Sequence, residues 1–184
     1  MIVAKAQRHG HVVRLKGGDS FVFGRGSEEI EFAQQNDLQT EVVPGISSAL
    51  AVPAGQGIPL TKRHVSESFW VITGTTKMHQ LSEDIKIAAL PSATVVILMG
   101  MGTLNEIVQV FSQAGKQHTP VAIIQNGTTS HEKSGFGTIE TIETVVAEKQ
   151  LSSPAIIVIG EVVANRVQFA SISKEVHANS LFQN

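Results

Sequence analysis

The sequence predicts an α/β fold. In the second half of the chain, short apolar runs recur at residues 68–73, 94–99, 121–125 and 154–160. Runs of this length that are apolar throughout are typical of strands buried on both faces of a sheet. Between two of them, residues 103–114 carry leucine, isoleucine, valine and phenylalanine at the helical period. Buried strands that alternate with helices indicate a sheet covered by helices.

The remaining elements of this half are shorter. Residues 82–90 and 142–149 are predicted as helices, and Gly115 ends the helix that precedes the third strand. Residues 138–139 are predicted as a short extended piece. The polar tail from residue 170 is predicted to be frayed or strand-like.

The first half begins with the end of a helix, residues 1–8, closed by Gly10. The apolar run at 12–15 is predicted as a buried strand, which two glycines terminate. A second helix is predicted over residues 27–35. Its first residue, Ser27, has a hydroxyl suited to capping, and two glutamates follow in the first turn, where the helix dipole favours acids.

Three more elements complete this half. Residues 41–43 are predicted as a short strand that a Pro-Gly pair stops. Residues 46–52 start a helix rich in small residues, which Pro53 limits or kinks. The glycine- and proline-bearing loop at 56–64 is predicted to be a hinge between two domains.

Composition excludes several classes of function. The chain has 184 residues, 42% of them hydrophobic, and a net charge of −2, so a core is available and no excess of basic residues points to nucleic acid. The absence of cysteine excludes disulfides and cysteine nucleophiles and fits a cytoplasmic protein. No apolar run approaches the roughly 18 residues of a membrane span. The seven histidines have no ligand-like spacing, so no metal site is predicted.

The most informative stretch is residues 12–29: a strand, a glycine turn, an apolar hook, a charged turn and a helix start. Gly17 and Gly18 would allow backbone to approach a ligand that a Cβ would exclude. Asp19 follows the predicted strand, and in open α/β sheets ligands bind beyond the carboxyl ends of strands. The alternative is an ordinary turn after a strand.

Residues 14–29 read Arg-Leu-Lys-Gly-Gly-Asp-Ser-Phe-Val-Phe-Gly-Arg-Gly-Ser-Glu-Glu. This stretch closely resembles the signature of uroporphyrinogen-III C-methyltransferases, within the tetrapyrrole methylase family. Val-Val-Pro-Gly-Ile-Ser-Ser-Ala at 42–49 and Gly-Ile-Pro-Leu-Thr at 57–61 resemble further family segments. Residues 71–75, 98–101, 125–128 and 153–155 complete the series, so the resemblance extends to about residue 163.

The resemblance implies two α/β domains with a cofactor cleft between them. Residues 1–60 would be the remainder of the N-terminal domain, and residues 61–184 the C-terminal domain. Full-length relatives begin with a strand and a glycine-proline loop that have no match here, so the first domain is expected to be truncated by about the first quarter of the usual enzyme. Smaller departures from the family are Ser20 for proline, Ser27 for glycine and Lys62 for histidine.

The resemblance also implies the cofactor, S-adenosylmethionine, which leaves as S-adenosylhomocysteine. In the family, backbone groups and small residues hold it. The adenine and ribose need neutral donors and acceptors, while the sulfonium tolerates carboxylate or carbonyl oxygens, and methyl transfer needs alignment rather than a metal. The matching positions are Gly17, Gly18, Asp19, Val22, Ser47, Ser48, Met99, Gly127 and Ala155.

The acceptor in the family is a tetrapyrrole with eight carboxylates, which arginine suits because its planar fork binds carboxylates bidentately. Arg25 and Arg63 match arginines that the family uses toward substrate, and Met99 would pack near the ring. Glu28 matches an acid that orients Arg25 or handles a pyrrole proton, so Arg25 and Glu28 are the catalytic candidates. The alternatives are a surface Arg25–Glu28 pair and a solvated Arg63.

The implied function is C-methylation of uroporphyrinogen III at two ring carbons, giving precorrin-2 for sirohaem or cobalamin, by a homodimer. One alternative is a non-catalytic truncated paralogue or fragment that keeps the dimer-forming, tetrapyrrole-binding domain. Another is a related methylase that acts on a later corrin intermediate.

Overall fold

Five strands form one mixed sheet in the order β1-β2-β5-β3-β4. In the computed structural model, which describes residues 2–76 and 80–169, they are β1 (Phe69–Thr73), β2 (Thr94–Leu98), β3 (Pro120–Gln125), β4 (Lys133–Thr138) and β5 (Ala155–Ile159). β1 and β2 are parallel, and the other three pairs are antiparallel. The predicted α/β class is confirmed, and so are the four apolar strands. The predicted tail lies outside the described residues.

β4 is longer than the short extended piece expected from the sequence. Its residues, Lys-Ser-Gly-Phe-Gly-Thr, are not an apolar run, because β4 is an edge strand that pairs only with β3. A Cβ on Gly135 would come within 2.7 Å of the Leu151 side chain and 2.8 Å of the Val145 side chain. Gly135 therefore allows the next helix to pack closely on the strand.

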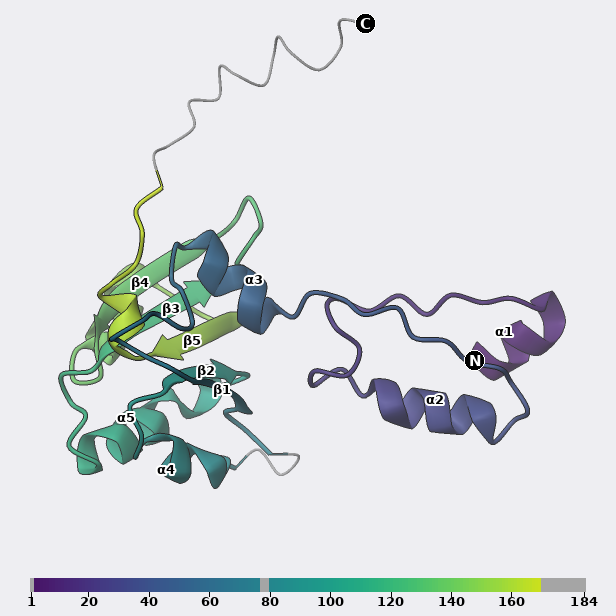
Figure 1. Cartoon of the computed structure of the whole chain (residues 1–184), viewed down its shortest axis with the longest axis horizontal. Coiled ribbons are helices and arrows are strands. Elements are labelled where there is room, and N and C mark those ends of the chain that lie inside the picture. Colours follow the sequence, from purple (N-terminus) through teal and green to yellow (C-terminus); the bar gives the residue numbers. More distant parts are fainter. Residues whose placement is uncertain (1, 77–79, 170–184) are drawn as a thin grey trace, which may run out of the picture.

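The helices match the expected segments to within a few residues. They are α1 (Ile2–His9), α2 (Gly26–Gln34), α3 (Ser48–Gly55), α4 (Asp84–Ala88), α5 (Leu104–Gln113) and α6 (Ile142–Lys149), with short 3₁₀ turns η1 (Met101–Thr103) and η2 (Glu161–Val163). Figure 1 shows α4 and α5 on one side of the sheet and α3 on the other.

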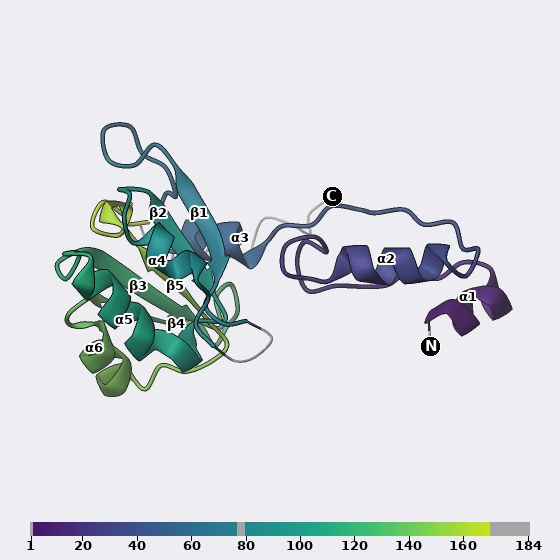
Figure 2. The ribbon, with the colours of Figure 1, turned by 90° about the horizontal axis from the view of Figure 1, so that it is seen from below.

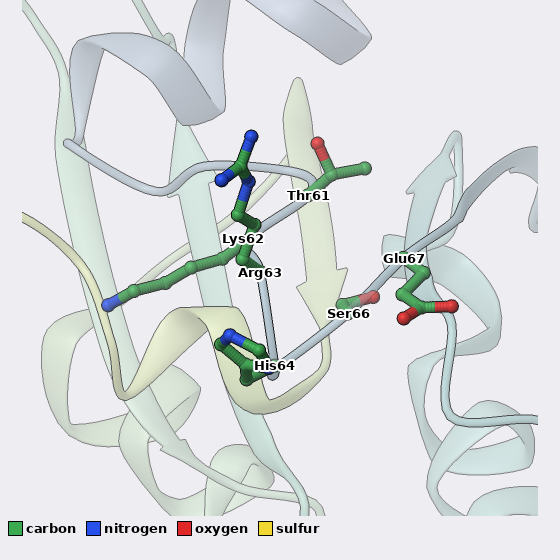
Figure 3. A pocket seen from close by; sticks show the side chains of 6 residues that line it. All are labelled: Thr61, Lys62, Arg63, His64, Ser66 and Glu67. Atoms are coloured by element: carbon green, nitrogen blue, oxygen red, sulfur yellow. The ribbon is translucent and has the colours of Figure 1, made fainter.

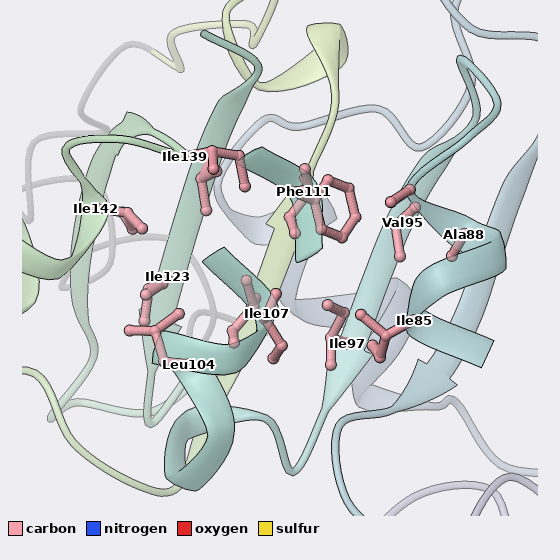
Figure 4. Close-up of a cluster of buried hydrophobic side chains, with 14 of the residues drawn as sticks. Ile85, Ala88, Val95, Ile97, Leu104, Ile107, Phe111, Ile123, Ile139 and Ile142 are labelled. Carbon is pink, nitrogen blue, oxygen red and sulfur yellow. The ribbon is translucent and has the colours of Figure 1, made fainter. Parts of the chain in front are cut away.

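The central strands alternate their side chains between two apolar clusters. Val95 and Ile97 point to the cluster that contains α4 and α5, whereas Val96 points to the cluster that contains α3. The same alternation holds for Ile123 and Ile124 of β3. Figure 4 shows the first cluster, with residues of α4 and α5 against β2 and β3. Burial on both faces explains why these strands have no polar side in the sequence.

Residues 2–46 form an arm that extends away from the sheet (Figures 1 and 2). The predicted strands at 12–15 and 41–43 are wrong, because none of the described residues of the arm belongs to a strand. Val13 and Val43 are 68% and 82% exposed. A strand needs a hydrogen-bonded neighbour, so the apolar runs alone did not suffice to make one.

Two helix ends also differ from expectation. α2 begins at Gly26 rather than Ser27, and no side chain caps it. Its start is set by the preceding turn, where the Gly26 N–H donates to the Ser20 carbonyl at 2.9 Å. Pro53 lies inside α3 instead of limiting it, and Ser47 caps that helix by accepting from the Ala49 N–H at 3.2 Å.

α3 packs against the sheet through Ala49 and Val52, which are buried with strand residues. The loop after it is held to the C-terminal segment, where the Val167 N–H donates to the Gly57 carbonyl at 2.8 Å. The expected division at residue 60 and the hinge stay predictions. No helix within residues 2–76 and 80–169 is long and apolar enough to cross a membrane.

The two-sided core makes a stability prediction. Ile123→Ala removes a side chain that is 0% exposed, and the resulting cavity should lower the free energy of unfolding by about 3 kcal/mol. Ile87→Ala is the matched control, because Ile87 is 54% exposed, and it should change stability by about 0.5 kcal/mol or less. Urea unfolding measures both, and equal losses would contradict the assigned core.

Candidate functional site

The carboxylate of Asp19 joins two loops that are far apart in the sequence. One oxygen accepts from the Phe21 N–H at 2.8 Å, and the other accepts from the Gly45 N–H at 3.1 Å. These bonds, first that from Phe21 and then that from Gly45, hold the pKa of Asp19 below its ordinary value of 3.8. The Val22 N–H acts in the same direction. Asp19 therefore organises the predicted glycine turn.

Glycines allow the two loops to meet backbone to backbone. An ideal Cβ on Gly45 would lie 2.7 Å from the Gly18 carbonyl oxygen. Gly18 itself has φ +127°, where a side chain is strained, and its Cβ would lie 3.4 Å from the Ile46 carbonyl oxygen. The contact thus places the turn at 17–19 beside the residues that lead into α3.

The two predicted serines have different roles at the start of α3. Ser47 is buried, and its hydroxyl is already used by the Ala49 N–H. Ser48 is exposed. Of the two hydroxyls, that of Ser48 is therefore the one directed to solvent and open to a ligand.

Three other predicted positions lie at one edge of the sheet, the edge where β2 and β3 end and β5 begins. Met99 directly follows β2, and the register pairs Leu98 with Ile156, next to Ala155. Gln125, two residues before Gly127, pairs with Ala155 itself. Because β5 runs opposite to β2 and β3, its start lies beside their ends.

This edge of the sheet meets α3. A Cβ on Gly127 would collide with the side chain of Val52 in α3, so only glycine fits between them. Met99 adopts a left-handed conformation, with φ 56°, and is 54% exposed. Contacts thus connect the predicted cofactor positions one after another. The turn at 17–19 contacts the residues before α3, and α3 contacts the sheet edge. Val22 lies exposed on the hook beyond the turn.

Arg25 and Glu28 contact each other. The Arg25 Nε donates to a Glu28 carboxylate oxygen at 2.9 Å, and both side chains are solvent-accessible. The bond to Glu28 raises the pKa of Arg25 above its ordinary value. The pair lines a hollow of about 500 Å³ on the arm. This is the geometry expected of the surface pair and equally of an acid that orients the guanidinium.

Sequence reasoning missed Glu29 in the same hollow. Its carboxylate accepts from Lys16 at 2.8 Å and from Arg14 at 3.3 Å, and the bond from Lys16 is the main cause that lowers its pKa. The adjacent Glu28 and Glu29 point to different cations, which the sequence does not distinguish. Only the positions of Glu28 and Glu29 around the helix, counted from a known first residue, could have predicted which cation each one contacts.

Arg63 is not brought together with Arg25. It lies in the loop Thr61–Glu67 and lines a second hollow, of about 370 Å³, with no residue in common with the first (Figure 3). Lys62 beside it bonds to the side-chain oxygen of Asn165 at 3.3 Å, which anchors the loop.

The chain matches the family described as Tetrapyrrole (Corrin/Porphyrin) Methylases over residues 1–143. It is 43% identical over 165 residues to a uroporphyrinogen-III C-methyltransferase of Methanocaldococcus jannaschii, a match that covers 89% of this chain and 68% of that protein. The chain belongs to the tetrapyrrole methylase family. The predicted resemblance is therefore confirmed.

Two further relatives extend the comparison. A siroheme synthase of Nitrosomonas eutropha is 40% identical, with 92% of this chain and 36% of that protein covered. The crystal structure of uroporphyrin-III C-methyltransferase from Thermus thermophilus with S-adenosyl homocysteine is 32% identical, with a TM-score of 0.76 and coverage of 89% and 71%. The chain thus spans about two thirds of the methyltransferase relatives and little more than a third of the siroheme synthase.

The donor set at the candidate site fits S-adenosylmethionine. The site offers the exposed backbone of Gly17, where a Cβ would meet no other atom, an exposed hydroxyl at Ser48 and a carboxylate at Asp19, as a neutral nucleoside and a sulfonium require. Among the residues that the structure describes, no three histidine, cysteine or acidic side chains gather to hold a metal ion.

Asp19 makes a pH prediction. Because its pKa is lowered in the folded chain, the order that it confers on the loops is fully present above about 3.8 and is lost as the pH falls through the folded pKa. Carboxyl NMR should show Asp19 titrating lower in the folded chain than in the same chain in urea. Protection of the Gly45 amide, taken as its exchange rate relative to the intrinsic rate at each pH, should fall as the pH falls over that range. In Asp19→Asn, this protection should no longer change with pH, and a change as large as in the native chain would contradict the assignment.

Proposed function

We propose that this chain acts in the S-adenosylmethionine-dependent C-methylation of uroporphyrinogen III to precorrin-2, in sirohaem or cobalamin biosynthesis. The observation that carries the proposal is the pair of hydrogen bonds that Asp19 accepts from the Phe21 and Gly45 N–H groups. They hold the glycine turn of the methyltransferase motif against the residues that lead into α3. The relatives named above, at 40% and 43% identity, support the same reaction.

The proposed cofactor contacts are the eight positions of the turn, the start of α3 and the sheet edge, together with Val22 on the hook. S-adenosylmethionine, when bound, supplies an activated methyl group and leaves as S-adenosylhomocysteine. Gly17 offers open backbone, and Ser48 offers a hydroxyl. The carboxylate of Asp19, already held by two N–H groups, keeps negative charge near the sulfonium. These residues bind and align, which is the main requirement of methyl transfer.

Arg25, Arg63, Glu28 and Met99 are proposed to face the tetrapyrrole. Arg25 uses its Nε and one Nη toward a single oxygen of Glu28, which leaves further N–H donors for a substrate carboxylate. In the proposal, Glu28 keeps the guanidinium charged and oriented. A pyrrole proton released as the ring carbon is methylated would pass to Glu28 or to solvent.

A second candidate function is tetrapyrrole binding without turnover. It is favoured by the exposure of the arm, where Gly17, Val22 and Phe23 lie open to solvent. We further propose that the chain is cytoplasmic, which the absence of cysteine supports. We also propose that it works as a homodimer, which the family resemblance supports. We also propose that the chain divides at residue 60 into two domains, with α3 of the first part packed on the sheet.

Calorimetric titration with S-adenosylhomocysteine tests cofactor binding. The full chain should bind it in the micromolar range. Asp19→Ala should weaken binding about tenfold or more, because the turn at 17–19 is then no longer held to Gly45. A folded chain that does not bind would exclude methyl transfer and leave the second candidate.

The arginine assignment predicts a loss confined to the tetrapyrrole. Arg25→Ala and Arg63→Ala should each weaken tetrapyrrole affinity about tenfold, because a bidentate guanidinium–carboxylate contact is removed. Affinity for S-adenosylhomocysteine should be unchanged. Arg8→Ala in α1 is the matched control. If Arg8→Ala weakened the affinity for the tetrapyrrole as much, the net charge of the chain rather than Arg25 and Arg63 would explain the binding.

A further inference from the structure

The turn between β3 and β4 lies beside α3 (Figure 1), and one side chain joins them. Glu132, at the end of this turn, is half-buried. One of its carboxylate oxygens accepts from the Thr128 N–H at 2.7 Å. The other accepts from the side-chain amide of Gln56, which is 76 positions away and caps the end of α3. Glu132 therefore connects two elements that carry proposed cofactor contacts.

The turn needs such support because its backbone is strained. Asn126 has φ 50° and Thr128 has φ 67°, both in the left-handed region that disfavours residues with a Cβ, and a β-branched threonine most of all. The Thr129 hydroxyl donates to the Asn126 carbonyl at 2.7 Å. The carboxylate of Glu132 accepts a hydrogen bond from the N–H of Thr128, the residue directly after Gly127. A charge-assisted bond at this point holds the strained conformation in place.

Gly127 is the residue that this conformation places. It sits between the two left-handed residues and packs on the side chain of Val52 in α3, where a Cβ would collide. The contact of Gly127 with Val52 sets how near the turn approaches the helix, while the bonds of Glu132 set its orientation. Both fix the spacing between Gly127 and the start of the same helix at Ser48.

We propose that Glu132, with Gln56, is a positioning residue that orients Gly127 for the methyl donor. This inference rests on the proposed function, since it assumes that Gly127 and Ser48 contact S-adenosylmethionine. Glu132 acts through the backbone of the turn and through Gln56 rather than by touching the donor. The apolar packing of α3 on the sheet, through Ala49 and Val52, does not involve Glu132, so the fold should survive its removal.

The test compares Glu132→Ala with Glu132→Gln in the full chain. Glutamine keeps an oxygen for the Thr128 N–H, and the Gln56 amide can turn to accept from its new NH₂ group. Glu132→Ala removes both hydrogen bonds and should weaken S-adenosylhomocysteine binding about tenfold, because the turn no longer holds Gly127 in place, and Glu132→Gln should stay within about twofold of the native chain. Glu140→Ala is the control, because its carboxylate bonds to His118 just beyond the opposite end of β4.

A second measurement separates positioning from general destabilisation. Amide exchange at Thr128 should accelerate in Glu132→Ala, while amides in β3 and β5 keep their protection. Rescue by glutamine together with this local change would support the proposal. It would be overturned by unchanged binding in Glu132→Ala, by equal loss in Glu132→Gln, or by exchange that rises throughout the sheet.

Failure of the native chain to bind S-adenosylhomocysteine would count against the proposed function separately. The link between Glu132 and the turn would then be decided by exchange at Thr128 alone. Acceleration confined to that amide would support the link, and unchanged exchange would refute it.

Discussion

The arrangement of the candidate site depends on the carboxylate of Asp19. The arm buries little apolar surface of its own: α1 has no buried residue, and α2 buries only Gly26. The arm is therefore held together by polar contacts, and the hydrogen bonds of Asp19 with Phe21 and Gly45 lie at the end of the arm that leads into α3. Ionisation of Asp19 strengthens both bonds, which is why the same geometry lowers its pKa.

The sheet contributes rigidity to the candidate site. Strands β2, β3 and β5 are packed on both faces, and their ends meet at the edge that carries Met99, Gly127 and Ala155. Catalytic and binding groups keep their geometry best when rigid elements support them. The proposed donor contacts thus combine a fixed edge with a turn held by hydrogen bonds.

Cations and acids line both hollows. The hollow on the arm balances cations against Glu28 and Glu29, whereas Arg63 lies in a separate loop anchored through Lys62. A carboxylate-rich ligand would compete with Glu28 for only some of the N–H donors of Arg25, because the guanidinium has more donors than Glu28 uses. This division is consistent with a ligand that contacts the protein at more than one place.

Sequence and structure decided different things. Apolar runs such as residues 94–98 and the helical period of 104–113 were sufficient for β2 and α5, because burial on a sheet or a helix face imposes its own period. The same reasoning failed at 12–15, since a strand also needs a partner. The family motifs alone indicated the cofactor and substrate classes. The pairing of Asp19 with Gly45 and that of Glu132 with Gln56 came only from tertiary structure, because hydrogen bonds between residues distant in sequence leave no periodic trace.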